Sequence, residues 1–192
     1  MEFTLSDQWF VVFASRKLGL TTGIYAREST LSSALFQINY LTGCMTQCPE
    51  KEISDILAIV SLDPFLLEGL DLAFSNERYV RHHIHSGKNY SLLAIAWLPG
   101  QASPIHSHKT WCALSVYEGH LTETLYSRDE IGVNLTSEKH LFRGHVSHAP
   151  YGKPVAHRLG NNSTRPAISL HVYGVPFDRL GIDVNHVWNE DR

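Results

Sequence analysis

The spacing of apolar residues changes once along this chain, near residue 78. Before that point, apolar side chains recur every three or four residues, which is the period of one helix face. Three segments follow this pattern, at residues 31–41, 53–60 and 63–74. From about Tyr79 onward the period is two, which is typical of strands because successive side chains point to opposite faces.

Local signals set the expected ends of the helices. Thr30 is placed to cap the first helix, and Gly43 lies where that helix should end. Asp63 followed by Pro64 is an N-cap residue with proline at the first helical position, so a third helix is predicted to begin there.

The second part of the chain reads as a series of short strands separated by Gly, Pro and Asn turns. They cover residues 90–100, 111–119, 120–126, 140–150, 153–161 and 167–176. The second and third of these are expected to form a hairpin around Glu118-Gly119-His120. Strands at this spacing predict a mainly β fold, an antiparallel barrel or jelly-roll sandwich. We expect residues 1–78 to form a small N-terminal helical cap on a barrel of residues 79–192, as one structural unit.

Length and charge narrow the functional classes. A chain of 192 residues is long enough for one well-cored domain. With 16 Lys and Arg against 19 Asp and Glu, it lacks the basic face that binds nucleic acid. No apolar run reaches the roughly 20 residues of a membrane-spanning helix, and the first residues do not resemble a signal peptide. The odd cysteine count, with Cys44 and Cys48 interpreted as structural, favours a reducing cytoplasm over a disulfide framework.

The 12 histidines are the unusual feature of the composition. His106 and His108 are two residues apart, so on a strand both imidazoles point to the same face. Two histidines do not complete a metal site, and the candidate third ligand is His157, which shares a face with Val155 and Leu159. In a rolled sheet those two faces can converge on one interior point.

Other histidines form weaker clusters. His82, His83 and His85 are close in sequence, but only the last two share a strand face, and we expect all three to be mostly exposed. His145 and His148 can approach a cavity mouth, although nothing in the sequence holds them there.

The spacing around the paired histidines resembles the two motifs of the cupin barrel family. The first runs Gly100, His106, His108, Cys112 and Gly119, with cysteine where the family normally has glutamate. The second runs Gly144, Pro150-Tyr151-Gly152, His157 and Asn161, with a slightly longer loop before the histidine. This resemblance implies a cupin-type fold and a metal held by His106, His108 and His157.

Within the cupins, the cysteine at position 112 resembles the thiol dioxygenases, and cysteine dioxygenase type I in particular. Tyr79-Val80-Arg81 is similar to that family's Tyr-x-Arg segment, and residues 169–173 are similar to its Ser-x-His-x-Tyr strand. The match extends from about Tyr79 to Pro176. Ser107 stands where the family usually has aspartate.

The resemblance implies one Fe(II) per chain and oxidation of a small thiol by O2 to its sulfinate. Arg81, with Tyr79, would bind the substrate carboxylate, since a guanidinium offers a planar two-pronged donor set. Ser169, His171 and Tyr173 share one strand face and would form a relay that aims the tyrosine hydroxyl at substrate or oxygen. Three neutral imidazoles leave the cation its full charge, which favours a thiolate.

The resemblance also implies that Cys112 and Tyr173 can join as a thioether. Cys112 shares the strand parity of His106 and His108, so it too can face the cavity. The alternative interpretation is a small buried cysteine, which is the usual role of a free one.

Several functions remain open at this point. L-cysteine is the first choice of substrate because of Arg81. Trp111 before Cys112 is more similar to bacterial relatives that prefer 3-mercaptopropionate. Mercaptosuccinate is a further candidate, with Arg179 or a spare histidine for its second carboxylate. A zinc or manganese cupin hydrolase or isomerase, and a small-ligand sensor, are the alternatives of other classes, because histidines alone do not select the metal. Monomer and small homo-oligomer both remain possible.

Overall fold

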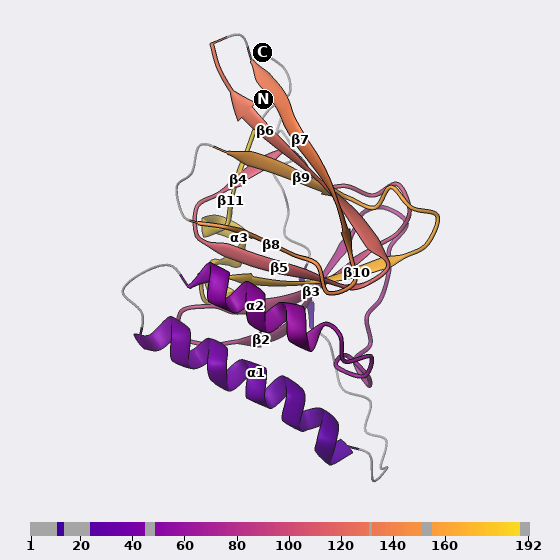
Figure 1. Ribbon diagram of the computed structural model, residues 1–192, viewed down its shortest axis with the longest axis vertical. Helices are drawn as coiled ribbons and strands as arrows, with labels where there is room; N and C mark the ends of the chain where they lie inside the picture. The colour runs from indigo at the N-terminus through magenta and orange to yellow at the C-terminus, as the bar shows by residue number, and fades with distance from the viewer. Residues whose placement is uncertain (1–10, 14–23, 45–48, 131, 151–154, 189–192) are drawn as a thin grey trace, which may run out of the picture.

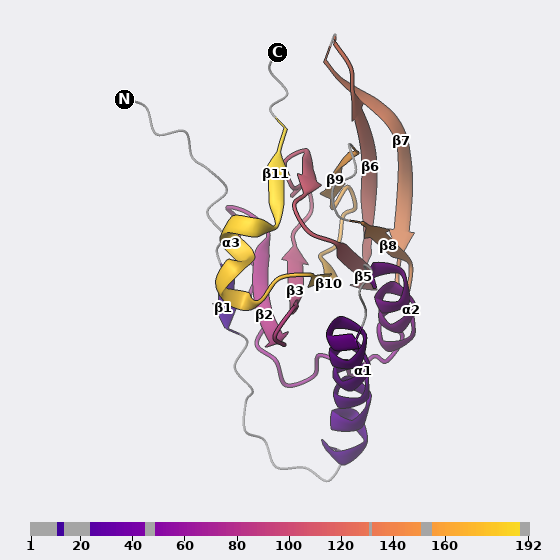
Figure 2. The same ribbon diagram turned by 90° about the vertical axis from the view of Figure 1, so that its left-hand side faces the viewer.

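Two β-sheets face one another, and two helices cover the outer side of the larger sheet (Figures 1 and 2). The computed structural model describes residues 11–13, 24–44, 49–130, 132–150 and 155–188. Figure 1 shows three layers, with the helices below, the larger sheet in the middle and the smaller sheet above. The mainly β class with helices at the N-terminus is therefore confirmed.

The larger sheet has six strands in the order β1-β2-β3-β10-β5-β8. Their bounds are β1 Val11–Phe13, β2 Val80–Ser86, β3 Ser91–Trp97, β10 Ala167–Tyr173, β5 Cys112–Glu118 and β8 Val146–Ala149. Neighbours pair antiparallel except β1 and β2, which are parallel. A strand from the first 78 residues therefore joins the edge of the sheet.

The smaller sheet has five strands in the order β11-β4-β9-β6-β7, all antiparallel. Their bounds are β11 Asn185–Val187, β4 His106–His108, β9 Ala156–Gly160, β6 His120–Arg128 and β7 Val133–Phe142. A 3-10 turn, Phe177–Arg179, and the short helix α3, Leu180–Asp183, connect β10 to β11.

The two faces of the six-stranded sheet have different partners, and strand alternation explains this. On β10, Leu170 and Val172 pack outward against α1 and α2, whereas Ser169, His171 and Tyr173 point to the interior. Every residue of β3 and β10 is buried, because both faces of these strands are covered. The expected division of β10 into a polar and an apolar face is thus correct.

The helical part differs in detail from the sequence prediction. Helix α1 spans Ile24–Cys44, so Thr30 lies inside it and does not cap it, whereas α2 spans Glu50–Val60. The predicted third helix is wrong. Residues 61–70 form successive turns, in which the Asp63 carboxylate accepts the amide of Phe65 and the amide of Leu66 bonds only three residues back, to Asp63. This local bonding replaces the helical ladder.

The predicted hairpin at Gly119 is also wrong, because β5 and β6 belong to different sheets. Gly119 has φ of +72°, and a Cβ there would lie 2.7 Å from the Pro166 carbonyl oxygen. The glycine therefore lets the chain turn from one sheet to the other past a closely approaching backbone. Similarly, the strand expected at residues 140–150 is the end of β7 and all of β8, divided at Gly144.

No helix among the residues that the structure describes is long and apolar enough to cross a membrane. Cys48, Tyr151 and Gly152, which the sequence interpretation used, lie outside the described residues.

Candidate functional site

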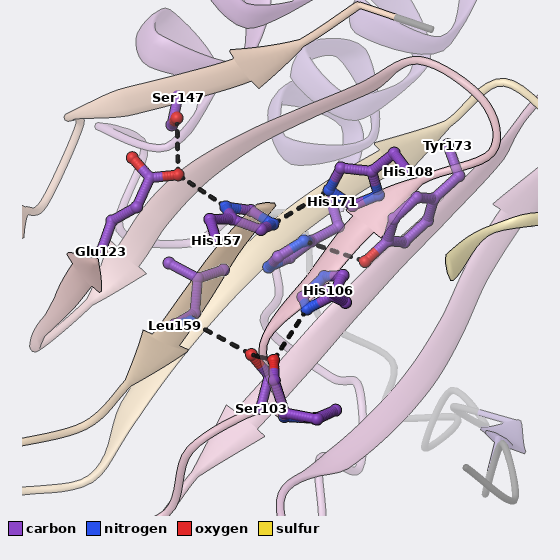
Figure 3. A network of polar contacts seen from close by, with 10 residues as sticks. Ser103, His106, His108, Glu123, Ser147, His157, Leu159, His171 and Tyr173 are labelled. Atoms are coloured by element: carbon purple, nitrogen blue, oxygen red, sulfur yellow. Dashed lines mark hydrogen bonds and ion pairs between the residues drawn. The ribbon is translucent and has the colours of Figure 1, made fainter. Parts of the chain in front are cut away.

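Three histidine side chains meet between the two sheets (Figure 3). His106 and His108 point to the same side of β4, and His157 of β9 is the direct pairing partner of His106. One nitrogen from each ring lies within 4.8 Å of the other two, and the Nε2 atoms of His108 and His157 are 2.9 Å apart. All three residues are buried. The structure therefore brings together three imidazoles from two distant parts of the chain.

The opposite ring nitrogens bind to the surrounding protein. His106 Nδ1 lies 2.9 Å from the Pro104 carbonyl oxygen, and His157 Nδ1 lies 2.7 Å from Oε1 of Glu123. Asn185, the pairing partner of His108 on β11, places its side-chain amide beside that imidazole. A carbonyl or carboxylate oxygen only accepts hydrogen bonds, so Nδ1 carries the hydrogen in His106 and His157. Their Nε2 lone pairs therefore face the common point.

Burial keeps the His106 and His108 rings neutral. The pKa of His106 and that of His108 lie well below the ordinary value, mainly because burial disfavours the charged imidazolium. The neighbouring His157 lowers both pKa values further. A neutral imidazole is the form that binds a metal, so these side chains are ready as ligands at neutral pH.

The arrangement fits a divalent cation. Three imidazoles on one side leave the cavity side open, as in metal sites that also bind a substrate. The outward nitrogens of His106 and His157 have the hydrogen-bonded surroundings that orient metal-ligating histidines in proteins. The donor set by itself is compatible with iron, zinc or manganese.

A cavity opens beside the three histidines. Its apolar wall includes Ile95, Trp97 and Leu159, and its polar wall includes Arg81, His171 and Tyr173. A smaller space next to it is also lined by His108 and His157. A molecule in the larger cavity would therefore lie next to the histidines.

Among the described residues that line this cavity, Arg81 is the one lysine or arginine. Its side chain is 7 % exposed, and its guanidinium donates a 2.7 Å hydrogen bond to the hydroxyl of Tyr79. The Tyr79 ring lies under the guanidinium and stacks on Trp97 with 4.4 Å between ring centroids. Tyr79 thus holds Arg81 in place, and a buried guanidinium in a cavity favours an anionic ligand.

A row of hydrogen bonds runs along the same six-stranded sheet, from Trp97 through Ser169 and His171 to Tyr173. Figure 3 shows its end, between His171 and Tyr173. The indole N–H of Trp97 only donates, so it donates to Ser169 Oγ at 2.9 Å. The Ser169 hydroxyl hydrogen is then free for donation to His171 Nε2, also at 2.9 Å. Burial lowers the pKa of His171 to about 3, so this ring is neutral, and in the tautomer that accepts from Ser169 its single hydrogen is on Nδ1.

The direction of this row has a consequence for Tyr173. His171 Nδ1 donates to the tyrosine oxygen at 3.2 Å, so the tyrosine hydroxyl hydrogen points away from His171. Burial raises the pKa of Tyr173 well above its ordinary value, and the hydroxyl stays protonated. Tyr173 can therefore act as a hydrogen-bond donor toward a molecule in the cavity.

Cys112 lies directly opposite Tyr173 in the pairing of β5 with β10, and both are buried in the same cluster. Burial strongly raises the pKa of the Cys112 thiol, and the charge of Glu123 raises it further. The thiol is therefore protonated and is not a free nucleophile at neutral pH.

Comparison with known proteins identifies the family. Residues 68–182, more than half of the chain, match the family model described as cysteine dioxygenase type I. The chain belongs to the cysteine dioxygenase type I family.

Curated relatives agree with this assignment. "Cysteine dioxygenase type 1" of Bos taurus is 32% identical over 110 residues, and that of Rattus norvegicus is 33% identical over 111 residues. Each match covers 55% of this chain and 55% of the relative, so the chain matches about half the length of these proteins.

Solved structures with some likeness include TT1209 from Thermus thermophilus, at 24% identity and a TM-score of 0.44, which covers 54% of this chain and 90% of that one. A Klebsiella pneumoniae protein with a double-stranded β-helix domain has 20% identity and a TM-score of 0.45, and covers 62% and 90%.

Some histidines of this family member lie away from the site. His82 was expected to be mostly exposed, but it is completely buried, with Nε2 2.9 Å from the carbonyl oxygen of Ala73. Ala73 lies at the end of the predicted third helix, and the strand pattern alone does not reveal its contact with His82. His83 and His85 are partly buried and His145 is exposed. His148 is exposed too, but it lines the smaller space beside His108 and His157, as the sequence suggested for a cavity mouth.

Two other positions receive a structural explanation. Arg179 forms an ion pair with Asp183 and does not line the cavity. Ser107, which replaces the aspartate usual in cysteine dioxygenases, points away from the other two β4 side chains, and its Oγ accepts the indole N–H of Trp188 at 3.2 Å.

The sequence interpretation missed Glu123 and Ser147. Glu123 is 1 % exposed on β6, and its Oε1 accepts hydrogen bonds from His157 and, at 2.9 Å, from Ser147 of β8 (Figure 3). One signal was available, because Glu123 shares a strand face with Leu121 and Leu125. A charged residue on an apolar face indicates a buried partner.

Proposed function

We propose that this protein is an iron-dependent dioxygenase of small thiol carboxylates, with L-cysteine as the first candidate substrate. The observation that carries the proposal is that three converging imidazoles and the buried Arg81 guanidinium line one cavity. A thiol carboxylate has a sulfur for a metal ion held by the imidazoles and a carboxylate for the guanidinium. Membership of the cysteine dioxygenase type I family supports the same chemistry.

In this proposal, His106, His108 and His157 hold Fe(II), which supplies Lewis acidity for the thiol and the redox chemistry with O2 when bound. Arg81 receives the substrate carboxylate, and Tyr79 keeps the guanidinium oriented toward it. The apolar wall, with Ile95 and Leu159, limits water around the sulfur. The overall reaction is R–SH + O2 → R–SO2H, in which both oxygen atoms end on sulfur.

Tyr173 is the proposed hydrogen-bond donor to the reacting group. Trp97 and Ser169 set the direction of the row, so His171 donates to the tyrosine oxygen and the phenol hydrogen remains available to the cavity. The role of Ser169 and His171 is then to orient this hydroxyl and keep it protonated.

The buried charges favour a monocarboxylate. Arg81 balances the charge of one carboxylate. Of the histidines that line the cavity, three form the proposed cation site and His171 is hydrogen-bonded to Tyr173, so none is left for a second carboxylate. Arg179, the candidate for a second carboxylate, is paired with Asp183 outside the cavity. L-cysteine and 3-mercaptopropionate therefore fit better than mercaptosuccinate.

A thioether between Cys112 and Tyr173 is a second part of the proposal, supported by their direct opposition in the β5–β10 pair. Its formation makes one S–C bond and removes the thiol hydrogen and one ring hydrogen. The two electrons and two protons go to O2. A peptide map of active enzyme should show a linked species lighter by two hydrogens, and unmodified Cys112 and Tyr173 in fully active enzyme would exclude it.

The test of the function is product analysis. Protein loaded anaerobically with Fe(II) is mixed with cysteine, 3-mercaptopropionate or mercaptosuccinate and oxygen, and sulfinates are measured by mass spectrometry. We expect one O2 consumed per thiol and both atoms of labelled O2 in the sulfinate. Absence of sulfinate from every thiol would refute the proposal, and a zinc-containing protein without thiol-dependent oxygen uptake would favour a cupin hydrolase or isomerase.

A further inference from the structure

Glu123 is a buried carboxylate next to the metal-ligand cluster. On β6 it is diagonal to His157 of β9, since Leu125 pairs with His157 and Glu123 pairs with Leu159. Residues that are diagonal across an antiparallel pair share a face and are within reach of long side chains. This register places Oε1 at 2.7 Å from His157 Nδ1.

The described surroundings of Glu123 offer its charge two hydrogen bonds and the more distant positive charge of exposed Lys139, its pairing partner on β7. Oε1 accepts from His157 and Ser147, but Oε2 is buried without a hydrogen-bond partner among the described residues. Within the described part of the chain, His157 is the ion-pair partner of this carboxylate, and no lysine or arginine forms an ion pair with it. Burying a carboxylate is costly unless a positive charge is near. A cation held at the far side of the His157 ring would provide that charge.

The three ligands differ in what stands behind them. His106 is hydrogen-bonded to a neutral backbone carbonyl, and His108 lies beside a neutral side-chain amide. His157 is instead hydrogen-bonded to a carboxylate. The first cupin motif normally carries a glutamate at the position that Cys112 occupies here. In this chain, Glu123 of β6 places a negative charge beside the ligand His157 and does not contact the metal position itself.

We propose that Glu123 is a positioning residue for the metal ligand His157. It fixes the hydrogen of that ring on Nδ1, aims the Nε2 lone pair at the metal, and places one negative charge behind the ligand. Ser147 holds the carboxylate in this orientation. The inference rests on the metal site of the proposed function, but not on its thiol chemistry.

The first test uses wild-type protein loaded with Zn(II), which is diamagnetic. Nitrogen-15 NMR of labelled histidines should show His157 with its hydrogen on Nδ1, and this hydrogen should be far downfield because it is bonded to a carboxylate. A His157 ring whose hydrogen is on Nε2, or whose Nδ1 hydrogen has the chemical shift of a bond to a neutral acceptor, would overturn the proposal. This measurement needs no variant to fold.

The second test compares the Co(II) affinity of E123Q and E138Q by competition with a chelator. Glu138 is exposed on the neighbouring strand β7, so E138Q removes the same charge away from the site. Loss of a hydrogen-bond partner behind a metal-ligating histidine typically lowers metal affinity by about 10- to 100-fold. We expect a loss in this range for E123Q and wild-type affinity for E138Q.

The metal measurements separate this inference from the proposed function. Wild-type Co(II) affinity in E123Q, or an equal loss in both variants, would overturn the role of Glu123 even if the protein oxidises thiols. A loss confined to E123Q supports it even if no thiol is oxidised. A metal-free E123Q protein with wild-type circular dichroism confirms that the loss is local.

Discussion

The two sheets contribute different chemistry to one cavity. The five-stranded sheet supplies all three imidazoles of the proposed metal site, from β4 and β9, and the carboxylate of Glu123 from β6. The six-stranded sheet supplies Arg81 from β2 and the polar row and Cys112 from β10 and β5. Metal binding and substrate handling therefore belong to different sheets, and mutation should separate them.

The electrostatics of the two walls differ in the same way. The wall of the five-stranded sheet has three imidazoles, of which those of His106 and His108 are neutral, and a carboxylate bonded to the third, which suits a cation. The other wall has one buried guanidinium and a protonated phenol, which suits an anionic substrate that needs a hydrogen-bond donor. The cavity thus has a wall that suits a metal cation and, facing it, a wall that suits an anionic substrate.

The largest effect is expected from removing a ligand on the five-stranded sheet. His157→Ala should leave less than about a tenth of the wild-type metal content, because two imidazoles on one strand do not close the site. Metal analysis after gel filtration, with circular dichroism to check the fold, measures this. His148→Ala, at an exposed histidine of β8, is the control. Full occupancy in H157A would remove His157 from the ligand set.

The matching change on the six-stranded sheet should spare the metal. Arg81→Ala removes the partner of the substrate carboxylate and should weaken binding by roughly 2–5 kcal/mol, which raises KM about 30-fold or more. Metal content should stay at the wild-type level. Arg179→Ala, outside the cavity, is the control. An unchanged KM for all three thiols in R81A would place the carboxylate site elsewhere.

Tyr173→Phe sharpens the comparison within the six-stranded sheet. It removes the hydroxyl and keeps the ring, so KM and metal content should change little while kcat falls about 100-fold, as for loss of a positioned proton donor. Steady-state kinetics at saturating thiol measure this. Equal kcat in the variant and wild type would assign the tyrosine a packing role.

The smallest expected effect concerns stability and pH. The pKa of His171 is about 3 in the fold against an ordinary 6.5, so between these values the unfolded chain binds a proton that the native protein does not. The free energy of unfolding that His171 contributes above pH 6.5 is therefore lost as the pH falls toward 3. For this one residue the loss between pH 7 and pH 5 is about 2 kcal/mol.

His171→Gln should reduce that loss, because glutamine does not titrate. Urea unfolding of metal-free protein at pH 7 and pH 5 gives the free energy of unfolding at each pH. His106 and His108 remain in the variant, and the effect of His171 on their pKa is smaller than that of their own burial. His148→Gln should keep the wild-type pH dependence, and an identical dependence in H171Q would contradict burial of a neutral His171.

Much of this site follows from local patterns in the sequence. Alternation on one strand is enough to place His106 beside His108, and to place Ser169, His171 and Tyr173 in one row. Period-two spacing is a local property, so it needs no knowledge of which strands pair. The motif spacing added His157 and Arg81, whose place beside the other residues depends on the register of distant strands.

The tertiary structure decided what local patterns do not contain. Gly119 predicted a turn, but only the packing of the two sheets shows that the chain passes from one to the other there. His82 is buried against the carbonyl of Ala73 in the segment just before β2, and Glu123 reaches His157 through the diagonal register of β6 and β9. The sequence by itself determined which side chains share a face. Which faces meet was decided by long-range strand pairing, because contacts between residues far apart in the chain depend on the whole packed molecule and not on local spacing.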